Sequence, residues 1–189
     1  MKDSLLRQSK KSFLKMEMNL EGSQTWQHVF GILQDTELHE TYRHVWTLQI
    51  NNTLDELTFS QRQQGWKIYK TSTFASFRCP SCRNFWNSAK VSLTFHYRLV
   101  EHKRGEVRLR LFRQVCRSCK NDIMLTGSFA RDKKEEVLMR LINKIKRNCY
   151  KEDIDIVDYF REMKITKPHE ASLCEACKMG KCSREEELF

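Results

Sequence analysis

The chain has 189 residues, of which 40% are hydrophobic and 31% charged, with only six glycines and two prolines. This composition excludes a collagen-like or linker-rich chain and fits one compact body. No apolar run approaches the ~20 residues of a membrane span, and residues 1–11 lack the apolar core of a signal peptide. We therefore expect a cytoplasmic protein with no transmembrane segment.

The net charge of +10 is concentrated in the middle of the chain. Residues 61–147 carry 21 basic and six acidic side chains, whereas residues 1–60 carry six and eight, and residues 148–189 carry seven and ten. A surplus of 15 positive charges in the middle segment favours an anionic partner, such as nucleic acid, anionic lipid or an acidic protein surface. The alternative is that lysine and arginine only keep this surface soluble.

The first expected elements are a helix and a strand. Residues 1–22 are polar and show no sustained period, so we interpret them as a flexible tail. Ser23 is placed to cap a helix, whose apolar stripe comprises Trp26, Val29, Phe30 and Leu33. Alternation over residues 42–50 predicts a half-buried strand. Two further short extended stretches are expected at residues 65–69 and 73–77.

The clearest pattern is that of a long β-hairpin. Apolar and polar residues alternate over residues 91–99 and again over 107–112, and residues 102–105 between them contain a glycine. One face of this hairpin is expected to pack on the core. The other is expected to be an exposed basic surface that binds a partner through Lys90, Arg98, Arg108, Arg110 and Phe112. The alternative interpretation is that these side chains merely solubilise the sheet.

A second helix is expected after the hairpin. Asp132 and Glu135 have the spacing of a capping box, which opens a helix by satisfying its first backbone N–H groups. The stripe that this helix buries consists of Val137, Leu138, Leu141, Ile142 and Ile145. Because the stripe is dense, we expect this basic helix to pack on the sheet rather than to face RNA or a membrane. Residues 150–168 are interpreted as a connection, and residues 184–189 as an acidic end.

Six of the eight cysteines form three Cys-x-x-Cys pairs, which are Cys79 with Cys82, Cys116 with Cys119, and Cys174 with Cys177. Such a pair supplies two of the four ligands of a tetrahedral zinc ion from one tight turn. In a reducing cytoplasm these pairs are expected to bind metal rather than to form disulfides. The first two pairs end predicted strands, so together they can close into a zinc-ribbon-like site with four cysteine ligands.

The third pair leaves two arrangements open. Locally, Cys174 and Cys177 can be completed by His169 and Cys182 into a site with three cysteines and one histidine. In a cross-braced arrangement they join one upstream pair, and the other pair takes His169, Cys182 or His96 as a ligand. We favour two zinc ions and the local site.

The expected fold is α+β, a zinc-ribbon-like antiparallel sheet with flanking helices, held over residues 23–183 by structural zinc. Cys149 is expected to be an idle thiol, and His96 a hydrogen-bonding surface histidine. The chain contains no P-loop, no Gly-x-Ser-x-Gly, no His-Glu-x-x-His and no deaminase motif. We therefore expect a protein that is not an enzyme and has no small-molecule substrate.

Four segments together resemble the receptor-transporting proteins, a family within the three-Cys-x-x-Cys zinc-finger group. The resemblance covers roughly residues 24–182. The matching residues are Gln64-Gly65-Trp66-Lys67-Ile68-Tyr69, Phe77-Arg78-Cys79-x-x-Cys82-x3-Trp86-x-Ser88-Ala89-x-Val91, Val107-Arg108-x-Arg110-x-Phe112-x-Gln114-x-Cys116-x-x-Cys119 and Cys174-Glu175-Ala176-Cys177-x-x-Gly180-x-Cys182.

This resemblance implies an accessory protein, or chaperone, that binds seven-helix receptors of the odorant or taste type. It would promote their transport to the plasma membrane and their insertion there. Some relatives resemble interferon-induced antiviral proteins that bind RNA, so an RNA-binding effector is the alternative function. Familiar members end in a hydrophobic anchor, whereas this chain ends at Glu185–Phe189. We therefore expect it to associate with the endoplasmic reticulum or plasma membrane through its partners.

Overall fold

The computed structural model describes residues 25–101, 104–119, 122–154 and 170–182. The predicted tail at 1–22 and acidic end at 184–189 lie outside them. In chain order the elements are α2 (Trp26–Gln34), a π-helical turn (Asp35–His39), α3 (Glu40–Tyr42), β1 (Val45–Ile50), α4 (Phe59–Gln63), β2 (Lys67–Arg78), β3 (Phe85–Val100), β4 (Arg104–Leu111), β5 (Gln114–Val115), β6 (Met124–Leu125), α5 (Arg131–Ile145), a second π-helical turn (Lys146–Tyr150), a 3₁₀ turn (Ala171–Leu173) and α6 (Glu175–Lys178).

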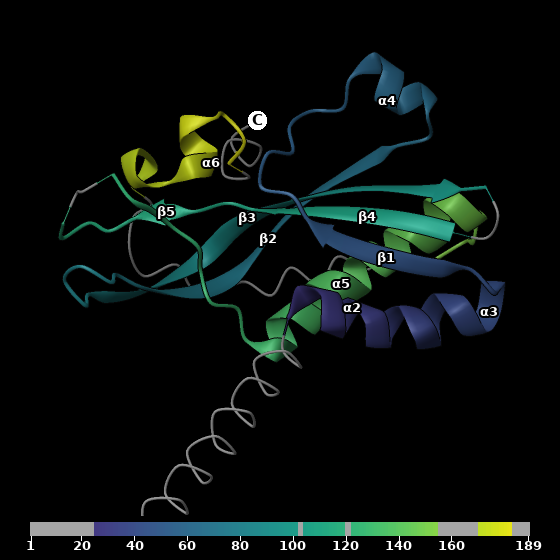
Figure 1. Cartoon of the computed structure of the whole chain (residues 1–189), viewed down its shortest axis with the longest axis horizontal. Helices are drawn as coiled ribbons and strands as arrows, with labels where there is room; N and C mark the ends of the chain where they lie inside the picture. The colour runs from purple at the N-terminus through teal and green to yellow at the C-terminus, as the bar shows by residue number, and fades with distance from the viewer. Residues whose placement is uncertain (1–24, 102–103, 120–121, 155–169, 183–189) are drawn as a thin grey trace, which may run out of the picture.

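The centre of the molecule is a four-stranded sheet with the strand order β1-β4-β3-β2 (Figure 1). The predicted hairpin is confirmed, since β3 and β4 pair antiparallel with Tyr97 opposite Val107. The two stretches expected near residues 65–69 and 73–77 are instead one continuous strand, β2, which pairs antiparallel with β3 and has a bulge between Thr73 and Ala75. Strand β1 lies parallel to β4 at the sheet edge.

Helices α2 and α5 cover one face of the sheet, and α4 and α6 lie on the other side (Figure 1). The covered face is the apolar one that alternation predicted, and its core residues include Phe95, Leu109, Leu138 and Ile142, all fully buried. Packing of α5 on the sheet is therefore confirmed. Burial of this apolar surface is the main source of the domain's stability apart from metal.

The edge strand β1 packs the ring of Trp46 against β4. The Trp46 ring lies over Gly105, so a Cβ atom at position 105 would overlap the indole. Only glycine, which has no Cβ atom, therefore fits at position 105. The Trp46 backbone N–H also donates to Gln34 Oε1 at 3.0 Å, and its indole N–H donates to the Tyr150 hydroxyl at 3.0 Å.

The helix starts differ from those expected. The Thr25 hydroxyl caps α2 by accepting from His28 N at 3.2 Å, so the cap is not Ser23, which lies outside the described residues. Helix α5 begins at Arg131 with Ala130 as its N-cap. The capping box expected at Asp132 and Glu135 is thus wrong. Asp132 lies inside the first turn, and Glu135 pairs with Arg131 at 2.8 Å.

Candidate metal centres

The first centre lies where strand pairs end. Between β2 and β3, Cys79 N donates to Asn84 O at 2.9 Å, and Arg83 N donates to Cys79 O at 2.9 Å. Arg83 has a φ of 60°, in the left-handed region. These features form a tight turn that presents the sulfur atoms of Cys79 and Cys82. The second turn, Cys116 to Cys119, lies between β5 and β6.

The four thiols of these two turns have the geometry of a tetrahedral metal site. The sulfur atoms of Cys79 and Cys119 are 3.7 Å apart, and those of Cys82 and Cys116 are 3.6 Å apart. A tetrahedral zinc ion with Zn–S bonds of about 2.3 Å requires sulfur separations of about 3.8 Å. The four cysteines therefore fit zinc, as their spacing predicted.

Backbone donors favour thiolate at particular cysteines. Hydrogen bonding from the Cys119 backbone N–H lowers the pKa of Cys116 to about 6, with help from the Asn84 side chain, whose Nδ2 lies 3.8 Å from the sulfur. The hydrogen bond with the Cys82 thiol raises the pKa of Cys119 to about 12. Without metal the four thiols share their remaining protons through these hydrogen bonds. Because zinc binds thiolates, its binding must release these protons.

The second centre comprises Cys174, Cys177 and Cys182, whose sulfur atoms lie within 4.8 Å of one another. The structure therefore places these three cysteines in a local cluster, since none of them joins the four of the first centre. Burial raises the pKa of both Cys174 and Cys177. His169, predicted as the fourth ligand, lies outside the described residues, so its role stays a prediction. The two clusters fit two structural zinc ions.

The other predicted histidine and cysteine lie away from both clusters. His96 is only 2% exposed, so the expectation of a surface histidine is wrong. It points away from the core, but nearby residues of the 51–57 segment shield it, and burial lowers its pKa. Among the described residues, neither His96 nor Cys149 belongs to a group with metal-ligand geometry.

The second centre is docked on β4 and β5. Glu175 N donates to Arg113 O at 3.0 Å, and Gln114 forms a β-bridge with Cys174. The ring of Phe112 is 2% exposed and packs in one cluster with Cys174, Ala176 and Cys182. The expectation that Phe112 is exposed on a basic surface is thus wrong, because the second centre covers it.

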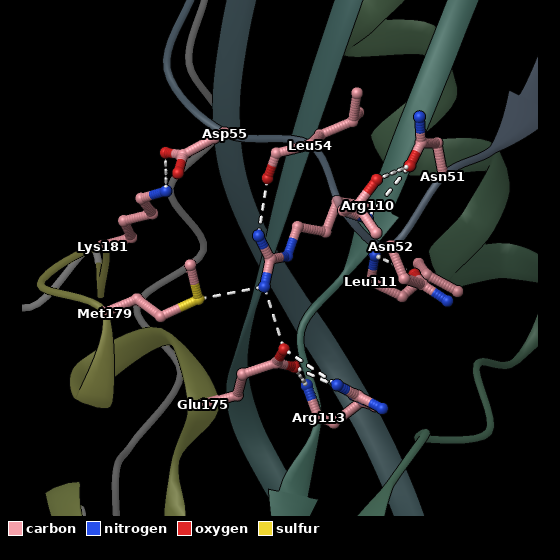
Figure 2. Close-up of polar contacts among 11 residues, drawn as sticks. Asn51, Asn52, Leu54, Asp55, Arg110, Leu111, Arg113, Glu175, Met179 and Lys181 are labelled. Carbon is pink, nitrogen blue, oxygen red and sulfur yellow. Dashed lines mark hydrogen bonds and ion pairs between the residues drawn. The ribbon is translucent and has the colours of Figure 1, made fainter.

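Arg110 is buried by the same centre, and its predicted exposure is also wrong (Figure 2). Its Nη2 lies 2.9 Å from Glu175 Oε1, and Nη1 donates to Leu54 O at 2.5 Å. The other oxygen of Glu175 accepts from Arg113 N at 2.8 Å. Burial favours the neutral acid, but hydrogen bonds from Arg113 and Arg110 outweigh it and hold the pKa of Glu175 below its ordinary value.

The segment before α4 is held at the same place (Figure 2). Asn52 Oδ1 accepts from Leu111 N at 3.2 Å, and Lys181, next to the ligand Cys182, forms an ion pair with Asp55. Sequence analysis missed Glu175 and these contacts. The one available signal was a glutamate between two predicted ligands, and nothing in the sequence says which arginines it meets.

The remaining predicted partner residues are Arg98, Arg108 and Lys90. The guanidinium groups of Arg98 and Arg108 lie 4.5 and 4.3 Å from the centre of the buried Trp66 ring. Arg98 also pairs with Glu106 at 3.1 Å. Both arginines therefore have structural contacts. A partner-binding role for them and for the half-buried Lys90 stays a prediction.

The protein is an α+β body whose strands end in cysteine turns. A second cysteine cluster is docked on this body. These features define a zinc-ribbon type of domain with structural metal centres. Residues 72–180 match a family of zinc ribbons with three Cys-x-x-Cys pairs, which is described as a zinc-binding domain. This match spans more than half of the chain, so the chain belongs to that family.

The curated relatives are receptor-transporting proteins, which confirms the resemblance predicted from the motifs. Receptor-transporting protein 3 of Mus musculus is 32% identical over 90% of this chain and 36% of its own length. Receptor-transporting protein 4 of Homo sapiens is 30% identical over 85% of this chain and 64% of its own length. Receptor-transporting protein 2 of Mus musculus is 31% identical over 71% of this chain and 60% of its own length. The chain thus spans between about a third and two thirds of these relatives. No solved structure matches it.

Proposed function

We propose that this protein is an accessory factor that binds seven-helix receptors of the odorant or taste type and promotes their transport to, and insertion in, the plasma membrane. The observation that carries the proposal is the match of 71–90% of the chain to proteins named as receptor-transporting. The two intact cysteine clusters support it, because they preserve the zinc-held scaffold of the matched family.

The first centre supports a role without catalysis. A zinc ion held by four cysteine sulfurs has no open position for water or substrate, whereas a catalytic zinc keeps one. In the described part of the chain, no helix has the length and hydrophobicity of a membrane span. We propose that the protein is held at membranes through its receptor partners.

The test is co-expression with an odorant receptor in cells that retain that receptor internally. Receptor at the cell surface is measured by flow cytometry on intact cells, and complex formation by co-precipitation. The parent chain and Cys149→Ser should raise surface receptor, whereas Cys116→Ser should not, because it removes a ligand of the first centre. Unchanged surface receptor and no co-precipitation with the parent chain, at equal expression, would contradict the proposal.

An RNA-binding effector remains the second candidate, supported by the surplus of 15 positive charges in residues 61–147. The exposed sheet face that was expected to bind RNA is smaller than predicted, because Arg110 and Phe112 are buried. Cross-linking in cells followed by sequencing of bound RNA tests it. RNA recovery that falls steeply with salt but survives competitor polyanion would favour this function.

A further inference from the structure

A dense run of basic side chains without acidic ones lies at the C-terminal end of α5. Residues 140–151 contain five lysines or arginines and no aspartate or glutamate. One of them, Lys146, forms an ion pair with Glu37 at 2.7 Å. The other four are Arg140, Lys144, Arg147 and Lys151.

Strand β2 adds another cation beside this run. Lys67 lies directly opposite Tyr97 in the sheet, so both side chains point to the helix-covered face. The Tyr97 hydroxyl accepts from Asn148 Nδ2 at 2.6 Å, which places Lys67 near the end of α5. Tyr69 lies two residues after Lys67 on β2. The Nζ atom of Lys144, on α5, lies 5.7 Å from the centre of the Tyr69 ring. We call Lys67, Arg140, Lys144, Arg147 and Lys151 the basic patch.

The patch differs from the first turns of the same helix. There, Arg131 pairs with Glu135 at 2.8 Å, and Lys133 with Glu136 at 3.1 Å. Within the patch, Arg140 lies 3.9 Å from Glu136, and no carboxylate of the described residues pairs with Lys67, Lys144 or Arg147. The helix dipole favours cations in the last turn, but it does not account for Lys67 on a neighbouring strand.

The positions of the aromatic residues favour anionic lipid over RNA as the partner of the basic patch. Binding of single-stranded RNA usually needs exposed rings on which bases stack. At the patch, Tyr69 stacks on Phe95 with a centroid distance of 6.1 Å, and Lys144 lies over its ring. Among the described residues, the most exposed aromatic rings are those of Phe59 on α4 and Phe85 at the start of β3. Long cationic side chains without available rings suit a layer of anionic headgroups.

We propose that the basic patch docks the protein on the anionic lipid leaflet of a membrane. This inference goes beyond the proposed function, because it concerns lipid and requires no receptor. Docking would hold the protein against the leaflet through the C-terminal end of α5 and the start of β2. The second metal centre would then face away, because α6 lies on the opposite side of the sheet (Figure 1).

The test is sedimentation of the full chain, loaded with zinc, with vesicles of phosphatidylcholine that contain or lack about a third phosphatidylserine. The chain should bind only the anionic vesicles, and binding should fall as salt is raised. Neutralising Lys67→Gln, Lys144→Gln and Arg147→Gln together should weaken binding about 100-fold, because each basic side chain at an anionic surface strengthens it about fivefold.

Two further variants are matched controls. Arg62→Gln, Arg104→Gln and Lys178→Gln remove the same charge from exposed positions outside the patch and should retain binding. The charge-preserving triple Lys67→Arg, Lys144→Arg and Arg147→Lys should also retain it. Zinc content and melting temperature are measured for every variant, so that loss of fold is recognised.

Three outcomes would overturn the proposal. The first is that the chain does not bind anionic vesicles at low salt. The second is that both neutralised triples lose binding equally, which would mean that net charge acts without a defined surface. The third is that single-stranded RNA binds tightly, displaces the vesicles and depends on the same three residues, which would make the patch an RNA surface. Failure of the receptor assay would leave the vesicle result unaffected.

Discussion

The two metal centres are built on different supports. The first joins the turn between the long strands β2 and β3 to the turn between the short strands β5 and β6, so its four cysteines tie the large sheet to the small one. The second lies on a segment with only a 3₁₀ turn and the four-residue α6, and it is fixed to β4 by the Glu175 contacts. Such short helices are not stable alone. The first centre should therefore determine whether the sheet folds, and the second whether one face of it is covered.

The largest effect is expected at the first centre. Cys116→Ser removes a fully buried ligand, so the variant should lose one zinc per chain and more than about 4 kcal/mol of unfolding free energy. Zinc is measured by atomic spectroscopy, and stability by urea denaturation under reducing conditions. Cys149→Ser is the control and should keep all of its zinc. Full zinc content in Cys116→Ser would show that the four cysteines do not form the site.

A smaller effect is expected at the second centre. Cys182→Ser should lose one zinc per chain but keep the first centre, and the lost docking contacts should cost roughly 3 kcal/mol. Zinc stoichiometry and hydrogen exchange of residues 104–115 measure the two effects. Exchange should increase at β4 and β5, where the second centre docks. Loss of both zinc ions would instead indicate that the two centres depend on each other.

The docking itself can be weakened without removing a ligand. Glu175→Gln takes away the charge that Arg110 and Arg113 share, and should lower the unfolding free energy by about 1.5–3 kcal/mol. Zinc content at saturation should not change, but a chelator should extract the second zinc faster. Glu170→Gln is the matched control on the same segment, because its exposed ion pair with Arg117 should contribute less than about 1 kcal/mol. Equal extraction rates in the two variants would contradict a docking role for Glu175.

The smallest effect is a pH dependence. The pKa of Glu175 is lowered from 4.5 in the folded protein, so its ionised form stabilises the fold above that value. This contribution should be lost as pH falls through the lower, folded-state pKa. The difference in unfolding free energy between the parent and Glu175→Gln should therefore be constant near neutral pH and shrink below about 4.5. A difference that grows in acid would mean that the carboxylate is not stabilised by its arginines.

The sequence predicted those parts of the fold that have a regular period or spacing. Alternation along residues 91–99 and 107–112 predicted β3 and β4, and the Cys-x-x-Cys spacing predicted both clusters. The second face of the sheet was mispredicted because Ser92, Thr94 and His96 have the polar character of exposed residues, yet all are buried. Residues 51–57, which lie beside His96, show no period, so alternation cannot reveal that they cover it.

The sequence also does not show what the Arg110 side chain contacts. An arginine that alternates with leucine and valine can point to water or to a buried carboxylate, and only the fold brings Glu175 to it across 65 positions of the chain. The parallel placement of β1 was equally beyond the sequence pattern, because a half-buried strand has the same period in either direction.

The placement of β1 has a consequence for the order of assembly. Val45 of β1 pairs with Arg104 of β4, so this contact must wait until the intervening residues have been synthesised and arranged. The hairpin of β3 and β4 needs only its own short turn, and contacts that are local in sequence form sooner than distant ones. We expect β1 and α2 to leave the ribosome first but to join the sheet last. In pulse-labelled hydrogen exchange during refolding, the amides of β3 should become protected before those of β1.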